Sequence, residues 1–295
     1  MHSGESESSQ KVWLITGTSS GFGLCLVKSV LARGDLVIAT ARDVTKIKHL
    51  QEDAENSQNI RLLELDIVSG EAVIRPIIAK AAEFWGRIDV LVNNAGYGAK
   101  GLLEETGSSQ LRLQYDTNVF GTLDVTNAVL PYMRIRKSGT IVMIGSRTSW
   151  RSENPATGLY GSSKAALRVL SETMATELAP FSIRMLIVEP AGFRTNSLSN
   201  ASFYTGNMIS DYDEMREKAM VWYETLNGMI RGDPVKAMEV LTDVVRGEGK
   251  AAGRPWPLYL VLGEVGVAGI SEKCKNVLKV IDDWRDVSVG LDVDV

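Results

Sequence analysis

Six short, mostly apolar runs recur in the first two thirds of the chain, and stretches with the apolar spacing of amphipathic helices separate them. The runs are Val12–Thr16, Leu36–Thr40, Arg61–Ile67, Ile88–Val92, Thr140–Gly145 and Ile183–Glu189. Strands that are apolar along their length are buried on both faces, which is typical of parallel sheets with helices on both sides. The sequence therefore predicts an α/β fold with one doubly wound parallel sheet, and ligand-binding residues at the carboxyl ends of its strands.

The length and composition predict one large domain. The chain has 295 residues, of which 44% are hydrophobic, and it contains no internal repeat or linker-like segment. This is enough apolar material to bury a single core. We expect a disordered, Ser/Glu-rich leader over residues 1–10 and a single domain over residues 11–295.

Charge and residue usage argue against several kinds of partner. The net charge is -4 and no long basic run occurs, so the sequence has no electrostatic footprint for nucleic acid or an anionic membrane. The apolar runs are shorter than the roughly 20 residues of a membrane-spanning helix. The two cysteines and two histidines lack metal-ligand spacing. We expect a cytoplasmic protein with no metal site, no nucleic-acid partner and no membrane partner.

The first apolar run breaks into a glycine-rich turn that contains Gly17, Gly21 and Gly23, and a helical pattern follows from Leu24 to Leu31. Glycines allow positive φ and close approach of a ligand to the backbone, and the free N–H groups of a helix start favour phosphate. The spacing Gly-x-x-x-Gly-x-Gly differs from the commoner dinucleotide fingerprint. It indicates a related phosphate-binding turn, or else a plain turn.

The end of the second run indicates which dinucleotide would bind. A carboxylate there would bind the ribose hydroxyls and repel a 2′-phosphate, but residues 39–42 contain none and end in Arg42. A guanidinium fork suits phosphate, so NADP(H) is favoured over NAD(H). The alternative is an ordinary surface pair between Arg42 and Asp43.

Polar residues also follow the third and fourth runs. Asp66 is expected near the adenine edge, and Asn93 and Asn94 come directly after a buried strand, before Ala95 and Gly96. Side-chain amides at a strand end can bridge the neighbouring strand and a cofactor ribose, or stabilise the turn itself.

Tyr160 and Lys164 are four positions apart in a helical pattern, so they lie on one helix face. An ammonium near a phenol favours the phenolate and lowers the tyrosine pKa from about 10, which would let Tyr160 exchange a proton at working pH. The alternative is a chance pair on an amphipathic helix.

Several motifs in register resemble the short-chain dehydrogenase/reductase family over about residues 10–195. They are the glycine turn, the segment Asn93–Gly96, Asn118, Ser146 and Tyr160-x-x-x-Lys164. The second strand end, the segment Glu189–Thr195 and the tail with Trp284 look like the subgroup similar to 17β-hydroxysteroid dehydrogenases. The resemblance implies a Rossmann-type fold and a homodimer or homotetramer, formed through the helices that carry Asn118 and Tyr160.

The resemblance also implies roles for individual residues. Tyr160 is the implied acid/base, Lys164 lowers its pKa and holds the nicotinamide ribose, and Ser146 binds the substrate oxygen. Asn118 is implied to hold a water in a proton relay, and Thr195 to meet the carboxamide. The residues expected to bind the cofactor are Gly17, Ser19, Ser20, Gly21, Phe22, Gly23, Arg42, Asp66, Ile67, Asn93, Asn94, Ala95, Gly96, Tyr160, Lys164, Pro190, Gly192 and Thr195.

Two positions depart from the family pattern. Family members usually have Pro-Gly after the sixth strand, whereas this chain has Pro190-Ala191-Gly192. Ser146 precedes Tyr160 by one position more than expected, with Ser149 and Ser152 nearby. We select Ser146 because it directly follows a strand.

Two later segments are open to alternative interpretations. Aromatic and Met residues concentrate between 196 and 232, which indicates either an apolar lid over a bulky substrate or packing of an insert. Trp150 and Arg151 are further candidates for the pocket wall. A terminal helix over about residues 272–286 has an apolar stripe, which would be core or a subunit interface.

Together these features predict an NADP(H)-dependent carbonyl reductase or alcohol dehydrogenase that acts on a hydrophobic, polyketide-like or terpenoid-like ketone. The alternative is an NADP(H)-binding protein without redox turnover, such as a cofactor-gated regulator or a non-redox cyclase. Such a chain would more often have lost a member of the Ser-Tyr-Lys set, and this one retains all three.

Overall fold

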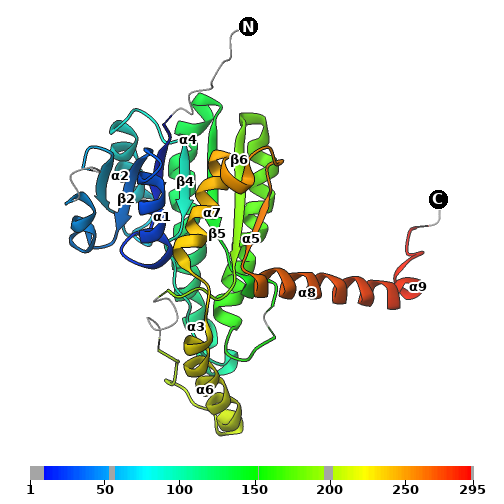
Figure 1. Ribbon diagram of the computed structural model, residues 1–295. Coiled ribbons are helices and arrows are strands. Elements are labelled where there is room, and N and C mark those ends of the chain that lie inside the picture. Colours follow the sequence, from blue (N-terminus) through cyan, green and yellow to red (C-terminus); the bar gives the residue numbers. More distant parts are fainter. Residues whose placement is uncertain (1–9, 53–56, 152, 196–201, 294–295) are drawn as a thin grey trace.

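Seven parallel strands form one sheet in the computed structural model, which describes residues 10–52, 57–151, 153–195 and 202–293 (Figure 1). The strand order is β3-β2-β1-β4-β5-β6-β7. The strands are β1 (Val12–Ile15), β2 (Leu36–Ala41), β3 (Ile60–Glu64), β4 (Val90–Asn93), β5 (Gly139–Ile144), β6 (Ile183–Pro190) and β7 (Tyr259–Leu262). The predicted α/β fold with one doubly wound, Rossmann-type sheet is confirmed.

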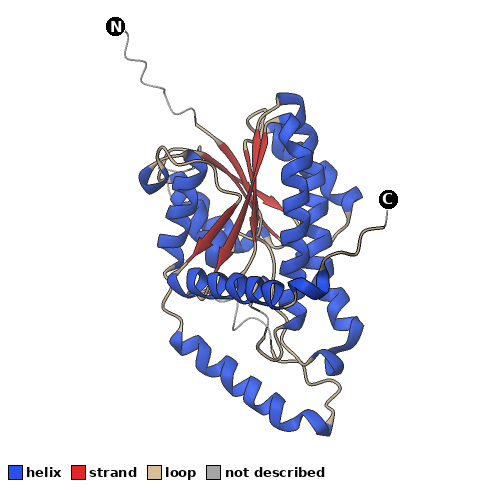
Figure 2. Cartoon of the chain, turned by 90° about the vertical axis from the view of Figure 1, so that its right-hand side faces the viewer, coloured by secondary structure: helices blue, strands red, loops and turns tan. Residues whose placement is uncertain are grey.

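Helices cover both faces of the sheet, as Figure 2 shows. One face carries α1 (Gly21–Leu31) and α7 (Pro234–Arg246). The other face carries α2 (Glu71–Glu83), α4 (Thr122–Arg136) and α5 (Gly158–Leu178). Short turns of helix connect these elements: η1 (Val44–Gln51), η3 (Arg147–Ser149), η4 (Ala179–Phe181), η5 (Ser210–Tyr212) and η6 (Gly249–Ala251).

Strand β1 explains why the apolar runs are continuous. Leu14 packs into the core with α2 and α4, whereas Trp13 and Ile15 pack into the core with α1 and α7. All three side chains are fully buried. A central parallel strand has no solvent-facing side, so no position along it is left for a polar residue.

The strand order places a topological switch point at the carboxyl ends of β1 and β4. The chain runs outward from β1 through β2 to β3 and then returns to β4 on the other side of β1. The loops that follow β1 and β4 therefore leave in opposite directions, and ligands of doubly wound sheets bind at such a switch point.

The helical segment around Asn118 is divided into three parts. Helix α3 (Leu103–Tyr115) leads into a π-helical segment, η2 (Asp116–Gly121), and then into α4. Within η2, Gly121 lies so close to the Ile67 carbonyl oxygen that a Cβ atom would overlap it. Side-chain spacing does not reveal a π turn, because one extra residue shifts the pattern only locally.

Two helices lie outside the layers around the sheet. Helix α6 (Asp213–Met229) lies beyond the carboxyl ends of the strands, below α3 in Figure 1. Helix α8 (Glu264–Asp283), followed by α9 (Arg285–Ser288), extends away from the sheet. In the described part of the chain, no helix is long and apolar enough to span a membrane. Of the leader expected over residues 1–10, residues 1–9 lie outside the described residues.

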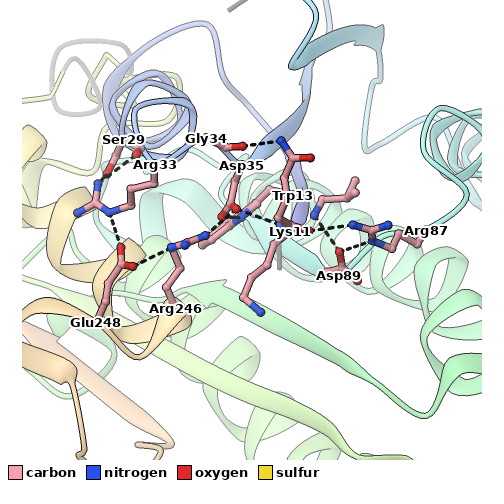
Figure 3. Close-up of polar contacts among 12 residues, drawn as sticks. Lys11, Trp13, Ser29, Arg33, Gly34, Asp35, Arg87, Asp89, Arg246 and Glu248 are labelled. Carbon is pink, nitrogen blue, oxygen red and sulfur yellow. Dashed lines mark hydrogen bonds and ion pairs between the residues drawn. The ribbon is translucent and has the colours of Figure 1, made fainter. Parts of the chain in front are cut away.

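A buried carboxylate joins the start of the sheet to the helix layer (Figure 3). Asp35, which is only 1% exposed, accepts hydrogen bonds from the backbone N–H of Lys11 and from the indole of Trp13, both at 2.9 Å. The guanidinium of Arg246 on α7 pairs with Asp35 at 2.6 Å. Arg33 and Glu248 extend this network towards α1.

Removing this carboxylate should destabilise the fold. Asp35→Ala would leave the Trp13 N–H without its acceptor and would remove the Asp35 ion pair of the buried Arg246, which keeps only its contacts outside Asp35, so we expect the free energy of unfolding to fall by about 3 kcal/mol in urea titrations. Glu214→Ala, which removes an exposed pair with Lys218, is the matched control and should cost less than about 0.5 kcal/mol. Equal losses in the two variants would contradict a structural role for the Asp35 network.

Candidate active site

Ser146 lies at the carboxyl end of β5 and begins the next turn. It is 7% exposed, and its Oγ accepts a hydrogen bond of 3.1 Å from the backbone N–H of Thr148, so it caps η3. This capping bond fixes the hydroxyl relative to the strand. The position agrees with the choice of Ser146 over Ser149, whose Oγ instead donates to Glu189.

Helix α5 brings Tyr160 and Lys164 to the same place. The ammonium of Lys164 lies 5.9 Å from the centre of the Tyr160 ring and donates a 2.6 Å hydrogen bond to the carbonyl of Ile144, the last residue of β5. Tyr160 lies close enough to Ser146 for the serine side chain to lower the tyrosine pKa. The serine, tyrosine and lysine that the sequence selected therefore meet at one strand end.

The protonation of this group differs from the expectation. Burial raises the pKa of Tyr160 above its usual value, a hydrogen bond with Ser146 opposes this shift, and the charge of Glu189 adds to it. Burial also lowers the pKa of Lys164 to about 8, against the charge of Glu189. Desolvation of the phenol thus outweighs the predicted effect of Lys164, and Tyr160 is a protonated donor at neutral pH.

Glu189 is the site residue that the sequence reasoning missed as a functional group. It is fully buried at the end of β6, and its carboxylate accepts a 2.7 Å hydrogen bond from the backbone N–H of Ser146. The Ser149 hydroxyl and the Trp150 indole donate to the other oxygen at 3.3 Å. A lone acid at the end of an otherwise apolar strand was the available signal.

Glu189 therefore holds the loop that carries Ser146. Burial raises its pKa to about 7, while the hydrogen bonds from the loop and the charge of Lys164 oppose this shift. Trp150, a candidate for the pocket wall, packs on Tyr259 and under the guanidinium of Arg168. Trp150 thus supports the loop on which Glu189 acts.

Asn118 lies in the π segment with its amide fully engaged. Its Nδ2 donates to the Tyr97 carbonyl at 2.9 Å and to the Ser163 hydroxyl at 3.1 Å, and its Oδ1 accepts from the Tyr97 N–H. A Cβ atom on Gly96 would lie 2.9 Å from this Oδ1 and 3.7 Å from the Lys164 ammonium. Asn118 therefore lies behind Lys164, where the implied relay residue is expected, and its role in a relay stays a prediction.

The glycine turn has backbone conformations that only glycine adopts easily, and its binding of a phosphate stays a prediction. Gly17 and Gly21 have φ values of 69° and 56°, in the left-handed region that favours glycine. A Cβ atom on Gly23 would overlap the carbonyl oxygen of Gly17. The Ser20 side chain makes no capping hydrogen bond at the start of α1, so the first N–H groups of this helix face outward with its positive dipole end.

The two amides after β4 have structural partners. Asn94 donates to the carbonyls of Thr16 and Gly17 at 2.8 and 3.0 Å, while the backbone N–H groups of Asn94 and Ala95 donate to the Thr16 hydroxyl. These bonds join β4 to the glycine turn. Asn93 is buried and donates to Thr126 and to the sulfur of Met143. Asn94 therefore stabilises the turn, whereas Asn93 connects β4 to α4 and to the neighbouring strand β5; a contact of either amide with a cofactor ribose stays a prediction.

Two further residues that are predicted to bind the cofactor, Arg42 and Asp66, follow strands β2 and β3. Arg42 is exposed directly after β2, and within the described residues it forms no ion pair. Asp43 instead accepts from the backbone and hydroxyl of Thr45, so the predicted alternative of an Arg42–Asp43 pair is wrong. Asp66, two residues beyond β3, accepts from the Val68 N–H at 3.2 Å and is partly buried.

The unusual Pro190-Ala191-Gly192 segment continues the pairing of β6 with β7 before the chain turns away from the sheet. Pro190 pairs with Leu262 in β7, and the Ala191 N–H donates to the Leu262 carbonyl. Gly192 does not adopt positive φ, and the chain beyond it pairs with Gly232 through Phe193. The extra alanine therefore extends β6 pairing by one hydrogen bond. Further along, a Cβ atom on Gly21 would lie 3.5 Å from Thr195, which brings this implied carboxamide partner beside the glycine turn.

Comparison with known proteins agrees with this geometry. A family model described as short chain dehydrogenase matches residues 11–203. This chain belongs to the short-chain dehydrogenase family. It is 35% identical to an uncharacterized oxidoreductase, YusZ, of Bacillus subtilis over 79% of this chain and 83% of that protein.

Two solved structures are similar to the structure of this chain. A short-chain dehydrogenase from Streptomyces avermitilis superposes with a TM-score of 0.83 at 35% identity and covers 97% of this chain and 100% of its own. The structure of ElxO with NADP bound has a TM-score of 0.69 at 27% identity and covers 88% of this chain and 99% of its own. The subgroup similar to 17β-hydroxysteroid dehydrogenases stays a prediction.

In the segment after β6, some side chains pack against the rest of the protein and others face solvent. Residues 196–201, which belong to the expected lid, lie outside the described residues. Phe203 pairs with Lys100 and packs edge-on against Tyr223 of α6. The Tyr223 hydroxyl donates to the Ala156 carbonyl, and burial, followed by the charge of Tyr160, raises the pKa of Tyr223 to about 12. In contrast, Met208, Met215 and Met229 are exposed.

A buried ion pair fastens this segment to the body of the dehydrogenase. Arg216 of α6 binds both oxygens of Glu105 at the start of α3, with the shortest distance 2.6 Å. Their side chains are 7% and 0% exposed. Helix α6 is therefore held over the carboxyl ends of the strands.

Glu189→Gln tests the buried carboxyl group under the Ser146 loop. The pKa of Glu189 is about 7 in the folded protein, against about 4.3 in an unfolded chain, so the folded state holds a proton that the unfolded state releases. The wild type should therefore lose stability as pH rises from about 4.5 to about 7, and the variant should lack this loss. Urea unfolding across this range measures both.

The control is Glu177→Gln at an exposed position of α5, which should reproduce the wild-type dependence. Wild-type and Glu189→Gln stabilities that stay parallel across this pH range would contradict a neutral, buried Glu189. Because the amide can still accept from the Ser146 N–H, the variant is expected to fold.

Proposed function

We propose that this short-chain dehydrogenase is an NADP(H)-dependent carbonyl reductase that acts on hydrophobic ketones, with Tyr160 as the proton donor. The observation that carries the proposal is the meeting of Ser146, Tyr160 and Lys164 at the end of β5, at the same edge of the sheet as the glycine turn after β1. A hydroxyl pair at one point suits a carbonyl oxygen that becomes an alkoxide.

The residues around the glycine turn fit a dinucleotide. The outward N–H groups at the start of α1 would hold the phosphates, Arg42 a 2′-phosphate, and Lys164 the nicotinamide ribose. NADPH, when bound, supplies the hydride. The similarity to ElxO, whose solved structure has NADP bound, supports the same cofactor for this chain.

The protein's own groups would handle the proton. Tyr160 is protonated because burial raises its pKa, so it can donate its hydroxyl proton to the substrate oxygen. Ser146 holds that oxygen by a hydrogen bond, and its position is set through Glu189. Lys164 is largely charged at neutral pH, since its pKa is about 8, and it stabilises the phenolate that remains. A protonated phenol favours reduction over oxidation at neutral pH.

The side chains above this group favour an apolar substrate. Tyr223 lies near Tyr160, and Phe203, Leu102 and Ala156 pack around it. Aromatic side chains in this place would bury a ring system or a long chain. The alternative function, cofactor binding without redox turnover, is not favoured because the Ser-Tyr-Lys set is complete and assembled. A cytoplasmic location stays a prediction.

Tyr160→Phe should abolish turnover. The phenyl ring keeps the packing but has no proton to give, so we expect at least about a 100-fold lower rate of NADPH consumption with a panel of hydrophobic ketones. Loss of absorbance of NADPH measures the rate. The matched control is Tyr132→Phe on α4, which is remote from the site. Unchanged consumption by Tyr160→Phe would refute the assignment of the acid.

Arg42→Ala should change the choice of cofactor. Without the guanidinium, binding of NADPH should weaken about 10-fold or more, because a charge-assisted contact to the 2′-phosphate is lost, while binding of NADH should stay within about 2-fold. Titrations followed by tryptophan fluorescence measure both dissociation constants. Lys46→Ala, an exposed cation nearby, is the control. Equal losses for NADPH and NADH would contradict the proposed contact.

A further inference from the structure

Helix α8 is anchored only at its first turns. Gly266, Gly269 and Ile270 are buried, and Arg151 binds both the Gly269 carbonyl and, at 2.6 Å, the carboxylate of Glu272. Beyond this root, every residue from 274 to 293 is exposed. Figure 1 shows the helix as an arm that leaves the body of the molecule. We call residues 271–288 the α8 arm.

The arm has one apolar half and one polar half. At 100° per residue, one half of the surface of the arm collects the apolar side chains, which are 47–63% exposed, together with Lys273 and, after the break at Trp284, Arg285. The apolar side chains are Val277, Leu278, Val280, Ile281, Trp284 and Val287. The opposite half carries Glu272, Lys275, Asn276, Lys279, Asp282, Asp283 and Asp286. Of the two predicted alternatives for this stripe, core packing is wrong within the described residues, and a subunit interface stays open.

Such an arm needs a covering surface. An isolated helix of this length is marginal in water, and its stability in proteins comes from packing of the apolar face. A half-exposed side chain of this size presents roughly 100 Å², so the arm and the adjacent Val289 and Leu291 offer about 800 Å². That matches the roughly 800 Å² per partner of a stable protein interface.

The spacing of the apolar residues indicates that the partner that packs against the arm is a second helix. Ile270, Cys274, Val277, Ile281 and Trp284 follow one another at intervals of four, three, four and three. This is the seam of a coiled coil, in which side chains of one helix fill the gaps of another. We propose that the α8 arms of two copies of this chain pack against each other, antiparallel, around a two-fold axis.

Charge favours the antiparallel arrangement. The first half of the arm, residues 271–278, carries two lysines and one glutamate, and the second half, residues 279–288, carries three aspartates, one lysine and one arginine. Antiparallel packing brings the net positive half of one arm against the net negative half of the other. Parallel packing would place like halves together.

A membrane surface fits this arm less well than a second copy does. Helices that lie on anionic membranes carry lysine and arginine on the polar face. Here that face has four acids, Glu272, Asp282, Asp283 and Asp286, against Lys275 and Lys279. The polar half therefore faces water in the pair of arms.

The first experiment measures the assembly state of the full chain by light scattering after size exclusion at micromolar concentration. Ile281→Glu places a charge in the seam and should halve the mass of the wild-type assembly. This holds whether wild type is a dimer or, with a second interface elsewhere, a tetramer. Asn276→Glu, the same new side chain on the polar half, should keep the wild-type mass. Unchanged thermal unfolding and NADPH binding of Ile281→Glu would show that the body is intact.

A wild-type monomer, or equal masses for wild type and Ile281→Glu, would overturn the proposal. Cosedimentation of a monomeric wild type with phosphatidylcholine/phosphatidylserine vesicles would assign the face to a membrane instead.

The second experiment tests the direction of packing by disulfide trapping in a Cys25→Ser background. An antiparallel seam places position 274 of one copy across from position 284 of the other, so Trp284→Cys should form a covalent dimer with the native Cys274 on oxidation. The background protein, which keeps only Cys274, should not. A covalent dimer through Cys274 alone would indicate parallel arms and overturn the antiparallel assignment.

Discussion

Burial of both faces of the parallel sheet is the constraint on which the other features depend. It removes polar residues from the strand interiors, as the fully buried side chains of Trp13, Leu14 and Ile15 illustrate. Polar and reactive groups can then be placed only at strand ends. The strand order places the topological switch point between the loops after β1 and β4. Ser146, Lys164 and the glycine turn lie at this edge because of the topology.

Backbone carbonyls and one buried acid hold this edge in shape. Lys164 is anchored to the carbonyl of Ile144, and Asn94 to the carbonyls of the glycine turn. Glu189 accepts from the Ser146 N–H and shares its surroundings with Lys164. Each anchor joins a reactive or ligand-facing segment to the end of a different strand. A rigid sheet therefore fixes the relative positions of groups that are far apart in the sequence.

The same burial also sets the protonation of the site. In water, an ammonium close to a phenol four residues away would lower the tyrosine pKa. In the folded protein the loss of water around Tyr160 raises its pKa, and the pKa of Lys164 falls for the same reason. The depth of a group below the surface is a tertiary property, which spacing along a helix does not give.

The sequence by itself determined the fold class, the glycine turn and the Ser-Tyr-Lys set, because each depends on local spacing and on the hydrophobic pattern of single elements. Tertiary structure alone decided four features: the π turn at Asn118, the hydrogen bonds of Glu189 to the Ser146 loop, the packing of Tyr223 against the body of the chain and the exposure of the α8 arm. Each of these depends on which distant segment packs against the residue. A helix in the core and an exposed helical arm can have the same apolar stripe in their sequences. Only the elements that pack against the helix in the folded protein distinguish the two.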